Sequence, residues 1–259
     1  MPVNLPRVGP RRARSDDRLH LTEHLDELRR RLIVSALALV VAFAGMYAIH
    51  DSLIDFLTWP LPGDHYQLIT LSPTEPFFTT LKVSFWAAII IALPIWLYQA
   101  YAFVIPAVAD QSRRVMLAIV TGLAGLFLAG VAFGYAVVLP VALNFLTGFG
   151  GDTFNAQLRA GEYFSFATSM LLASGILFEV PIAMTALARM GVASAALYRK
   201  QWRIALVGIA AIAAILPGGD PISMLLLMLP QFVLYGVGIA LSAKFGQAPL
   251  WRREELDPT

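Results

Sequence analysis

The amino-acid sequence predicts an all-α membrane protein with six transmembrane helices, and three observations support that prediction. Hydrophobic residues make up 58% of the 259 residues and charged residues only 14%, a balance typical of chains that lie in a membrane. Six apolar runs approach or exceed the length that crosses about 30 Å of hydrocarbon as a helix. These runs are continuous, whereas the strands of a membrane barrel alternate in polarity.

The six runs define the expected spans in order. They cover residues 32–49, 77–105, 115–146, 163–188, 204–216 and 222–243. The second and third exceed one crossing, so we expect them to tilt or to extend into the headgroups. We expect helices five and six to be short, and the fifth run has only 13 residues, which is about 20 Å of helix. Either the flanking Trp202 and Arg203 snorkel to the interface, or the bilayer is thinner beside the last hairpin.

Small and helix-breaking residues predict how the spans bend and pack. Gly130 and Gly134 form a small-xxx-small pair, which favours close helix packing. Each proline within or at the end of a run removes the donor for the carbonyl four residues earlier. We therefore expect kinked helices in a concave bundle, with kinks at Pro94, Pro140, Pro181 and Pro230.

The lysines and arginines indicate the orientation of the chain. Of the 19 lysine and arginine residues, 17 lie in the N-terminal segment, the loops 106–114 and 189–203, and the C-terminal tail. By the positive-inside rule both termini are cytoplasmic, while the loops 50–76 and 147–162 and the turn 217–221 face outward. The expected organisation is a cytoplasmic segment with an amphipathic helix (1–31), a six-helix transmembrane domain (32–243) and a cytoplasmic tail (244–259).

One carboxylate, Glu179, lies inside an apolar run two residues before Pro181. An ionised carboxylate in hydrocarbon costs about 2.5–3.5 kcal/mol on insertion scales, so such groups usually face protein or water. Two interpretations stay open at this point. Glu179 either belongs to a structural kink and is hydrogen-bonded to a neighbouring helix, or it lines a wet, functional cavity.

Five motifs follow one another along the chain: HLDELRRRL at 24–32, SPTEPFFTTLKVS at 72–84, QAYAFVIPA at 99–107, FEVP at 178–181 and LPGGD at 216–220. Together they resemble the successive motifs of the TatC family, the receptor and core subunit of the twin-arginine translocase. The resemblance implies a receptor, not an enzyme, in the bacterial cytoplasmic (inner) membrane. It would bind twin-arginine signal peptides of folded precursor proteins and assemble into an oligomeric complex with the single-span subunits TatA and TatB. Transport would use the proton-motive force, with no cofactor, metal or nucleic acid.

The resemblance also implies roles for individual residues. Signal-peptide binding is expected at Glu27, Arg29, Phe103, Asp110, Ser112 and Arg113. Intramembrane function is expected at Glu179 and Gln99, and a place in the outer loops or at partner contacts is expected for Pro60, Pro76, Phe77, Phe78 and Asp220.

Two positions depart from the family pattern. Ser112 stands where an acidic residue is usual, so either Asp110 supplies the second acceptor for the signal peptide or Glu27 acts with backbone carbonyls. Met224 stands where a glutamine is usual early in the last span, which puts partner contacts there in doubt.

Carboxylates suit the recognition of paired arginines on physical grounds. A guanidinium is a rigid planar fork that matches a carboxylate bidentately, whereas lysine is a point charge. Two adjacent arginines call for more than one acceptor. Glu27 would lie within reach of the first cytoplasmic loop if the first two spans are neighbours, although it could simply pair with Arg31 four residues later.

The alternative function is a proton- or ion-coupled secondary transporter in which Glu179 titrates. Residues 75–95 and 162–182 align without gaps, matching Glu75 with Glu162 and Pro94 with Pro181, as a parallel pseudo-repeat would. A membrane enzyme is disfavoured because no nucleophile and base, and no metal-ligand set, converge at one depth. The HLTEH segment at 20–24 matches a zinc-protease pattern but fits an amphipathic interfacial helix better.

Overall fold

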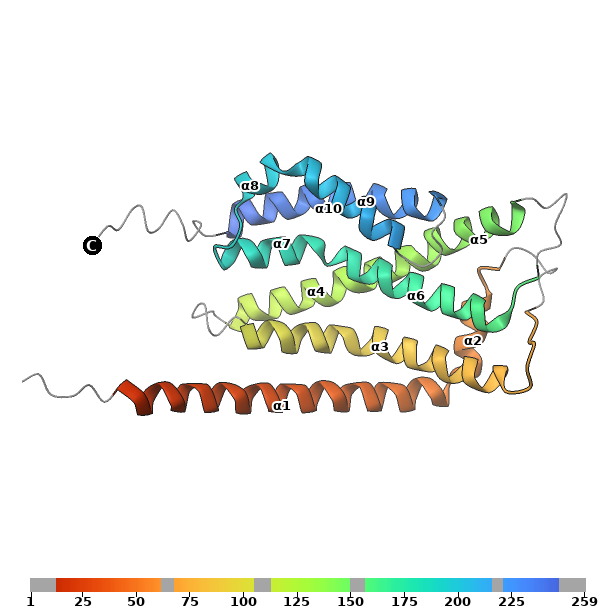
Figure 1. Ribbon diagram of the computed structural model, residues 1–259, viewed down its shortest axis with the longest axis horizontal. Coiled ribbons are helices and arrows are strands. Elements are labelled where there is room, and N and C mark those ends of the chain that lie inside the picture. The colour runs from red at the N-terminus through yellow and green to blue at the C-terminus, as the bar shows by residue number, and fades with distance from the viewer. Residues whose placement is uncertain (1–12, 62–67, 105–112, 150–156, 216–220, 247–259) are drawn as a thin grey trace, which may run out of the picture.

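The computed structural model describes residues 13–61, 68–104, 113–149, 157–215 and 221–246. In this part of the chain the regular structure is helical, and the long helices lie roughly along one axis, while the short α2 runs across it (Figure 1). The elements are α1 (Ala13–Ala48), α2 (His50–Thr58), α3 (Glu75–Val104), α4 (Arg113–Phe133), the π-helical turn η1 (Gly134–Val138), α5 (Leu139–Gly148), α6 (Ala160–Phe178), α7 (Val180–Arg189), α8 (Ala195–Lys200), α9 (Trp202–Ile215) and α10 (Pro221–Phe245).

The six predicted spans are confirmed in the described residues. Five stretches are long and apolar enough to cross a membrane: Leu25–Ala48, Glu75–Ala100, Val120–Gly148, Ala160–Arg189 and Pro221–Phe245. The remaining span, fifth in chain order, is α9, an apolar helix of only 14 residues, so the predicted short fifth helix is confirmed. The prediction of a short sixth helix is wrong, because α10 continues through Pro230 and has 25 residues. The turn predicted at 217–221 falls almost wholly outside the described residues.

The helices pack in a layered order that leaves α1 at one edge. α1 lies against α3, both α3 and α4 lie against α6, and α7 lies against α10 (Figure 1). Among residues 25–50, all of which are described, none is buried, so much of the surface of α1 is not covered by the rest of the chain. α1 also runs unbroken from Ala13, so the N-terminal segment and the first span share one helix.

Two of the four prolines coincide with interruptions of the helices. η1 lies directly before the segment that contains Pro140, and α6 gives way to α7 immediately before Pro181. Such π-helical turns and missing amide donors are known causes of kinks. α3 and α10, by contrast, continue through Pro94 and Pro230. The break at Pro181 positions Glu179 at the junction between α6 and α7.

The predicted close packing of the third span is confirmed at its glycines. A Cβ on Gly130 would lie 2.6 Å from the carbonyl oxygen of Ser174, and one on Gly134 would lie 2.7 Å from Ser174 Oγ. Both distances are too short for any larger residue, so the glycines allow α4 and η1 to approach α6 closely.

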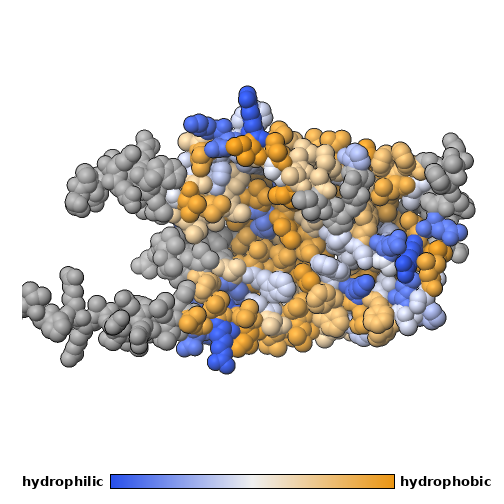
Figure 2. All heavy atoms as spheres, viewed as in Figure 1, coloured by the Kyte–Doolittle hydropathy of each residue, from blue (hydrophilic) through white to orange (hydrophobic). Residues whose placement is uncertain are grey.

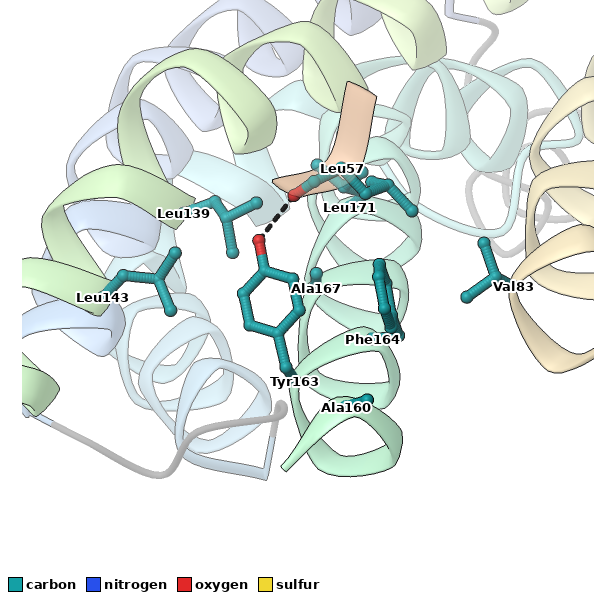
Figure 3. Close-up of a cluster of buried hydrophobic side chains, with 9 residues drawn as sticks. All are labelled: Leu57, Val83, Leu139, Leu143, Ala160, Tyr163, Phe164, Ala167 and Leu171. Carbon is teal, nitrogen blue, oxygen red and sulfur yellow. Dashed lines mark hydrogen bonds between the residues drawn. The ribbon is translucent and has the colours of Figure 1, made fainter. Parts of the chain in front are cut away.

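The end of the bundle that holds α2 and the first turns of α3 and α6 is called the outer end here, and the opposite end the inner end. A buried apolar cluster joins α2, α3, α5 and α6 at the outer end (Figure 3). It contains Leu57, Val83, Leu139, Leu143, Ala160, Tyr163, Phe164, Ala167 and Leu171. The Tyr163 hydroxyl donates to the Leu57 carbonyl at 2.5 Å, and the Tyr135 hydroxyl donates to the Phe56 carbonyl at 2.7 Å. α2 is therefore held by residues far away in the sequence.

α8 is held in a similar way at the inner end. Ser194 Oγ accepts from the Leu197 amide at 3.2 Å and so caps the helix. The Tyr198 hydroxyl donates to the Met184 carbonyl at 3.1 Å, while the Tyr198 carbonyl accepts from the Tyr235 hydroxyl at 2.8 Å. These contacts fix the loop 189–203 against α7 and α10.

Candidate functional site

The inner ends of α1 and α3 are joined by a polar group of three residues. Arg31 donates to Glu27 Oε1 from Nε at 3.0 Å and from Nη2 at 2.5 Å. Its Nη1 also donates to Gln99 Oε1 at 3.2 Å. The pairing of Glu27 with Arg31, which the sequence suggested, is therefore present, and it extends across to the second span.

This arrangement leaves half of the Glu27 carboxylate available. Both contacts from Arg31 fall on Oε1, and the Glu27 side chain is 40% exposed. Oε2 has no hydrogen-bond donor among the described residues. Arg31 thus orients the carboxylate while Oε2 can accept from another guanidinium.

The structure describes only some of the other residues that were expected around Glu27. Arg29 is exposed on α1, and Phe103 is half-buried near the inner end of α3, where it has an interaction partner. Arg113 begins α4, although its side chain lies outside the described residues. Asp110 and Ser112 also lie outside them, so the choice between these two as second acceptor stays a prediction.

Glu179 sits between α6 and α7 with its side chain buried. Its backbone completes the junction, because its amide donates to the Ile176 carbonyl at 3.1 Å and its carbonyl accepts from the Ala183 amide at 3.0 Å. Neither carboxylate oxygen forms a hydrogen bond of ordinary geometry within the described part of the chain, but the carboxylate interacts with the backbone of Phe127 on α4. The structural interpretation required such a partner on a neighbouring helix. The interaction with Phe127 is of that kind, so both interpretations of Glu179 stay open.

The expected outer-loop residues lie at the other end of the molecule. Pro60 is buried just after α2, whereas Pro76 is exposed in the first turn of α3. Phe77 and Phe78, also in that turn, are each 56% exposed. Asp220 lies outside the described residues. This end is therefore far from the polar group around Glu27.

A second polar network, centred on Glu75, fastens the outer ends of α3 and α6. Glu75 Oε1 accepts from Arg159 Nε at 2.9 Å and from the Gly161 amide at 3.2 Å, and Oε2 accepts from the Leu71 amide at 2.9 Å. The Glu75 carboxylate raises the pKa of Arg159 above its usual value. An isolated bridge between Ile69 and Arg159 adds two backbone hydrogen bonds. This network is structural, because every strong acceptor in it has a partner.

The family model for Sec-independent protein translocase protein (TatC) matches residues 23–230. The chain belongs to the TatC family. The match contains all of the described polar groups, from Glu27 to Glu179.

Individual relatives agree with this assignment over most of their length. A Sec-independent protein translocase protein TatC of Helicobacter pylori is 37% identical over 229 residues, which is 88% of this chain and 89% of that one. A chloroplastic TATC of Arabidopsis thaliana is 36% identical over 221 residues, 85% of this chain and 65% of that one. A crystal structure of the twin-arginine translocase receptor TatC in DDM superposes with a TM-score of 0.76 at 34% identity, covering 85% of this chain and 99% of that one.

The expectations about family and class are therefore confirmed. The chain is a multi-pass membrane protein and a core component of a Tat protein translocase. The relatives are named as translocase components, not as classical enzymes, and a secondary transporter is no longer favoured.

Sequence reasoning missed the role of Glu75 and Arg159. The available signal was that Arg159 is the one basic residue in the expected outer loops, where such residues are depleted. The alignment of 75–95 with 162–182 also paired Glu75 with Glu162. Both carboxylates are found beside Arg159, since Glu162 Oε1 lies 3.7 Å from Arg159 Nη1.

Proposed function

We propose that this TatC-family protein is a receptor for twin-arginine signal peptides of folded precursors, located in the bacterial cytoplasmic membrane. In this proposal it works in an oligomeric complex with the single-span TatA and TatB, and export draws on the proton-motive force. The solved relatives are described as twin-arginine translocase receptors, which supports the first part.

The observation that carries the proposal is the half-occupied carboxylate of Glu27. It lies at the inner end of α1, is 40% exposed and keeps Oε2 without a donor among the described residues. Because Arg31 and Gln99 fix its position, little conformational entropy is lost when a ligand binds. A guanidinium could donate two hydrogen bonds to such a group, whereas an ammonium offers no matching fork.

The second arginine of the signal peptide needs a second acceptor. We place it on the loop 106–114, with Asp110 in the role that an acidic residue at position 112 would otherwise take. The loop connects the end of α3 to the start of α4. Glu27 is linked to Gln99, near the end of α3, through Arg31. The loop therefore follows closely after a residue of the proposed site.

The test is the affinity of the purified full-length protein for a twin-arginine precursor. Glu27→Ala should weaken binding roughly ten- to a hundredfold, the effect of losing one charge-assisted hydrogen bond of about 1.5–3 kcal/mol. Asp26→Ala is the matched control, because Asp26 is the exposed acid next to Glu27 on the same helix and should leave the affinity unchanged.

A precursor with two lysines separates recognition from a general loss of structure. The wild-type protein should bind it much more weakly than the twin-arginine precursor, and Glu27→Ala should reduce this difference. If Glu27→Ala binds the twin-arginine precursor as tightly as the wild type does, the receptor site is not at this surface.

A further inference from the structure

Lys82 is a basic side chain inside a membrane span, and neither the fold nor the proposed receptor function accounts for it. It lies seven residues after Glu75, the first residue of α3, and so about 10 Å from the outer end of the helix. The side chain is exposed, and no described carboxylate lies within ion-pair distance of it. An ammonium at this depth must reach toward the interface or meet an anion.

A cavity of about 620 Å³ lies beside Lys82, between the outer ends of α3 and α6. This volume is within the range of small-ligand sites, which is roughly 300–1,000 Å³. Figure 2 shows hydrophilic residues gathered over these two helix ends, on an otherwise apolar flank. The polar lining closest to the membrane consists of Lys82, Thr79 and Ser165.

The hydrogen-bond donors in this inner part of the cavity are unused. The hydroxyls of Thr79 and Ser165 and the ammonium of Lys82 make no hydrogen bond within the part of the chain that the structure describes. A group with several acceptor oxygens could bind all three at once. Gly161 keeps the space open, since a Cβ there would lie 3.1 Å from Glu75 Oε1 and 3.6 Å from Thr79 Oγ1.

The charges that line the cavity are ordered by depth. Arg159 lies 2.9 Å from Glu75 and 3.7 Å from Glu162, so it is shared between two carboxylates and this group keeps one net negative charge, opposite the positive charge of Lys82. Lys82 is the deeper of the two. Glu162, in the first turn of α6, has a side chain that is 78% exposed at the mouth. The described lining is thus positive inside and negative outside, with no net charge.

This order matches a zwitterionic phospholipid, whose phosphate lies next to the acyl chains and whose amine extends toward water. We propose that the cavity binds the headgroup of an outer-leaflet phospholipid that carries a primary amine, with its phosphate on Lys82, Thr79 and Ser165 and its ammonium toward Glu162. An anionic headgroup without an amine would gain the contact with Lys82 but would be repelled by Glu162.

The proposal is tested by native mass spectrometry of the full-length protein, with phosphatidylethanolamine, phosphatidylcholine and phosphatidylglycerol offered in turn. The wild type should retain one phosphatidylethanolamine in preference to the other two lipids. Lys82→Gln should reduce its retention by roughly tenfold, the scale of one lost charge-assisted hydrogen bond. Lys82→Arg should keep it.

The other variants identify each end of the headgroup. Glu162→Gln should weaken retention of phosphatidylethanolamine but not of phosphatidylglycerol, and so remove the preference between them. Lys200→Gln, which removes an exposed lysine from α8 at the inner end, is the matched control and should change nothing.

Three results would overturn the proposal. One is equal retention of phosphatidylethanolamine by the wild type and Lys82→Gln. Another is a wild-type preference for phosphatidylglycerol, which would indicate an anionic-lipid site. The third is release of the retained lipid by millimolar inorganic phosphate in the wild type, because a free phosphate would then suffice. Signal-peptide affinity is not expected to change in any of these variants, so this outcome is independent of the receptor proposal.

Discussion

At the scale of single residues, three carboxylates on apolar helices differ in the donors that surround them. Glu75 accepts three hydrogen bonds, one oxygen of Glu27 accepts from Arg31, and Glu179 interacts weakly with the backbone of Phe127 among the described residues. A carboxylate whose oxygens all accept hydrogen bonds stabilises the folded structure. A buried carboxylate with few hydrogen bonds lowers the stability of the folded protein. Glu75 has the pattern of a structural group, whereas binding by Glu27 and a role of Glu179 in translocation stay predictions.

Glu179→Gln should separate structure from transport. The amide keeps the size of the side chain and removes the charge, so the protein should insert and fold while losing most export of a twin-arginine precursor. Glu75→Gln is the contrasting variant, because it breaks the pair with Arg159 and should lower the thermal unfolding midpoint. Export assays and thermal melts of both purified variants check this. Normal export by Glu179→Gln would leave only a structural role for that residue.

The acceptor on the first cytoplasmic loop can be found by a short series of substitutions. Asp110→Asn should weaken binding of a twin-arginine precursor less than Glu27→Ala does, but clearly more than Ser112→Ala, because only Asp110 carries charge. Ser112→Glu should hold or strengthen binding. Precursor titrations on the purified protein measure all three. Equal affinity of the wild type and Asp110→Asn would mean that Asp110 only balances Arg113 and Arg114, an exposed pairing worth about 0–1 kcal/mol.

At the scale of helices, the sequence was informative where a single chain segment decides the outcome. Long apolar runs form spans because every backbone group in lipid must bond within the segment, and all six runs do so. α2 and α8 were missed because they are short and depend on distant partners. Tyr163 and Tyr135 hold α2, and Tyr235 contacts α8. A local sequence pattern does not predict such long-range contacts. Isolated helices of this length are marginal in water.

The helix of greatest interest is α9, because its 14 residues span only about 21 Å. Arg203 stacks on Trp202 with its guanidinium carbon 5.7 Å from the ring centroid, so these two residues could reach the interface by snorkelling. If the bilayer is instead thinned beside α9 and α10, the mismatch between the length of α9 and the normal bilayer thickness contributes to translocation.

Lengthening α9 distinguishes these cases. Four leucines inserted after Ile209 add about one turn, which should relieve the mismatch, impair export and leave precursor binding largely intact. Export and binding assays on the same preparation provide both readouts. Unchanged export in the lengthened protein would show that snorkelling suffices.

At the scale of the whole molecule, the two ends of the bundle are specialised differently. The inner end carries the Glu27 group, whose network leaves an acceptor available, and most of the basic residues whose side chains the structure describes. The outer end is fastened by the apolar cluster around Tyr163 and by the Glu75 network, whose acceptors are occupied. This difference between the two ends is what the proposed binding of a signal peptide at the inner end requires.

The central claim, that the inner end around Glu27 is the receptor surface, is tested most directly by photocrosslinking. A photoreactive residue at position 30, exposed and one turn beyond Glu27, leaves the carboxylate intact, and position 77 at the outer end is the control. A twin-arginine precursor should crosslink from position 30 and not from position 77, and replacing its arginines with lysines should abolish the product. Absence of a crosslink from position 30, or an equal product with the twin-lysine precursor, would contradict the claim.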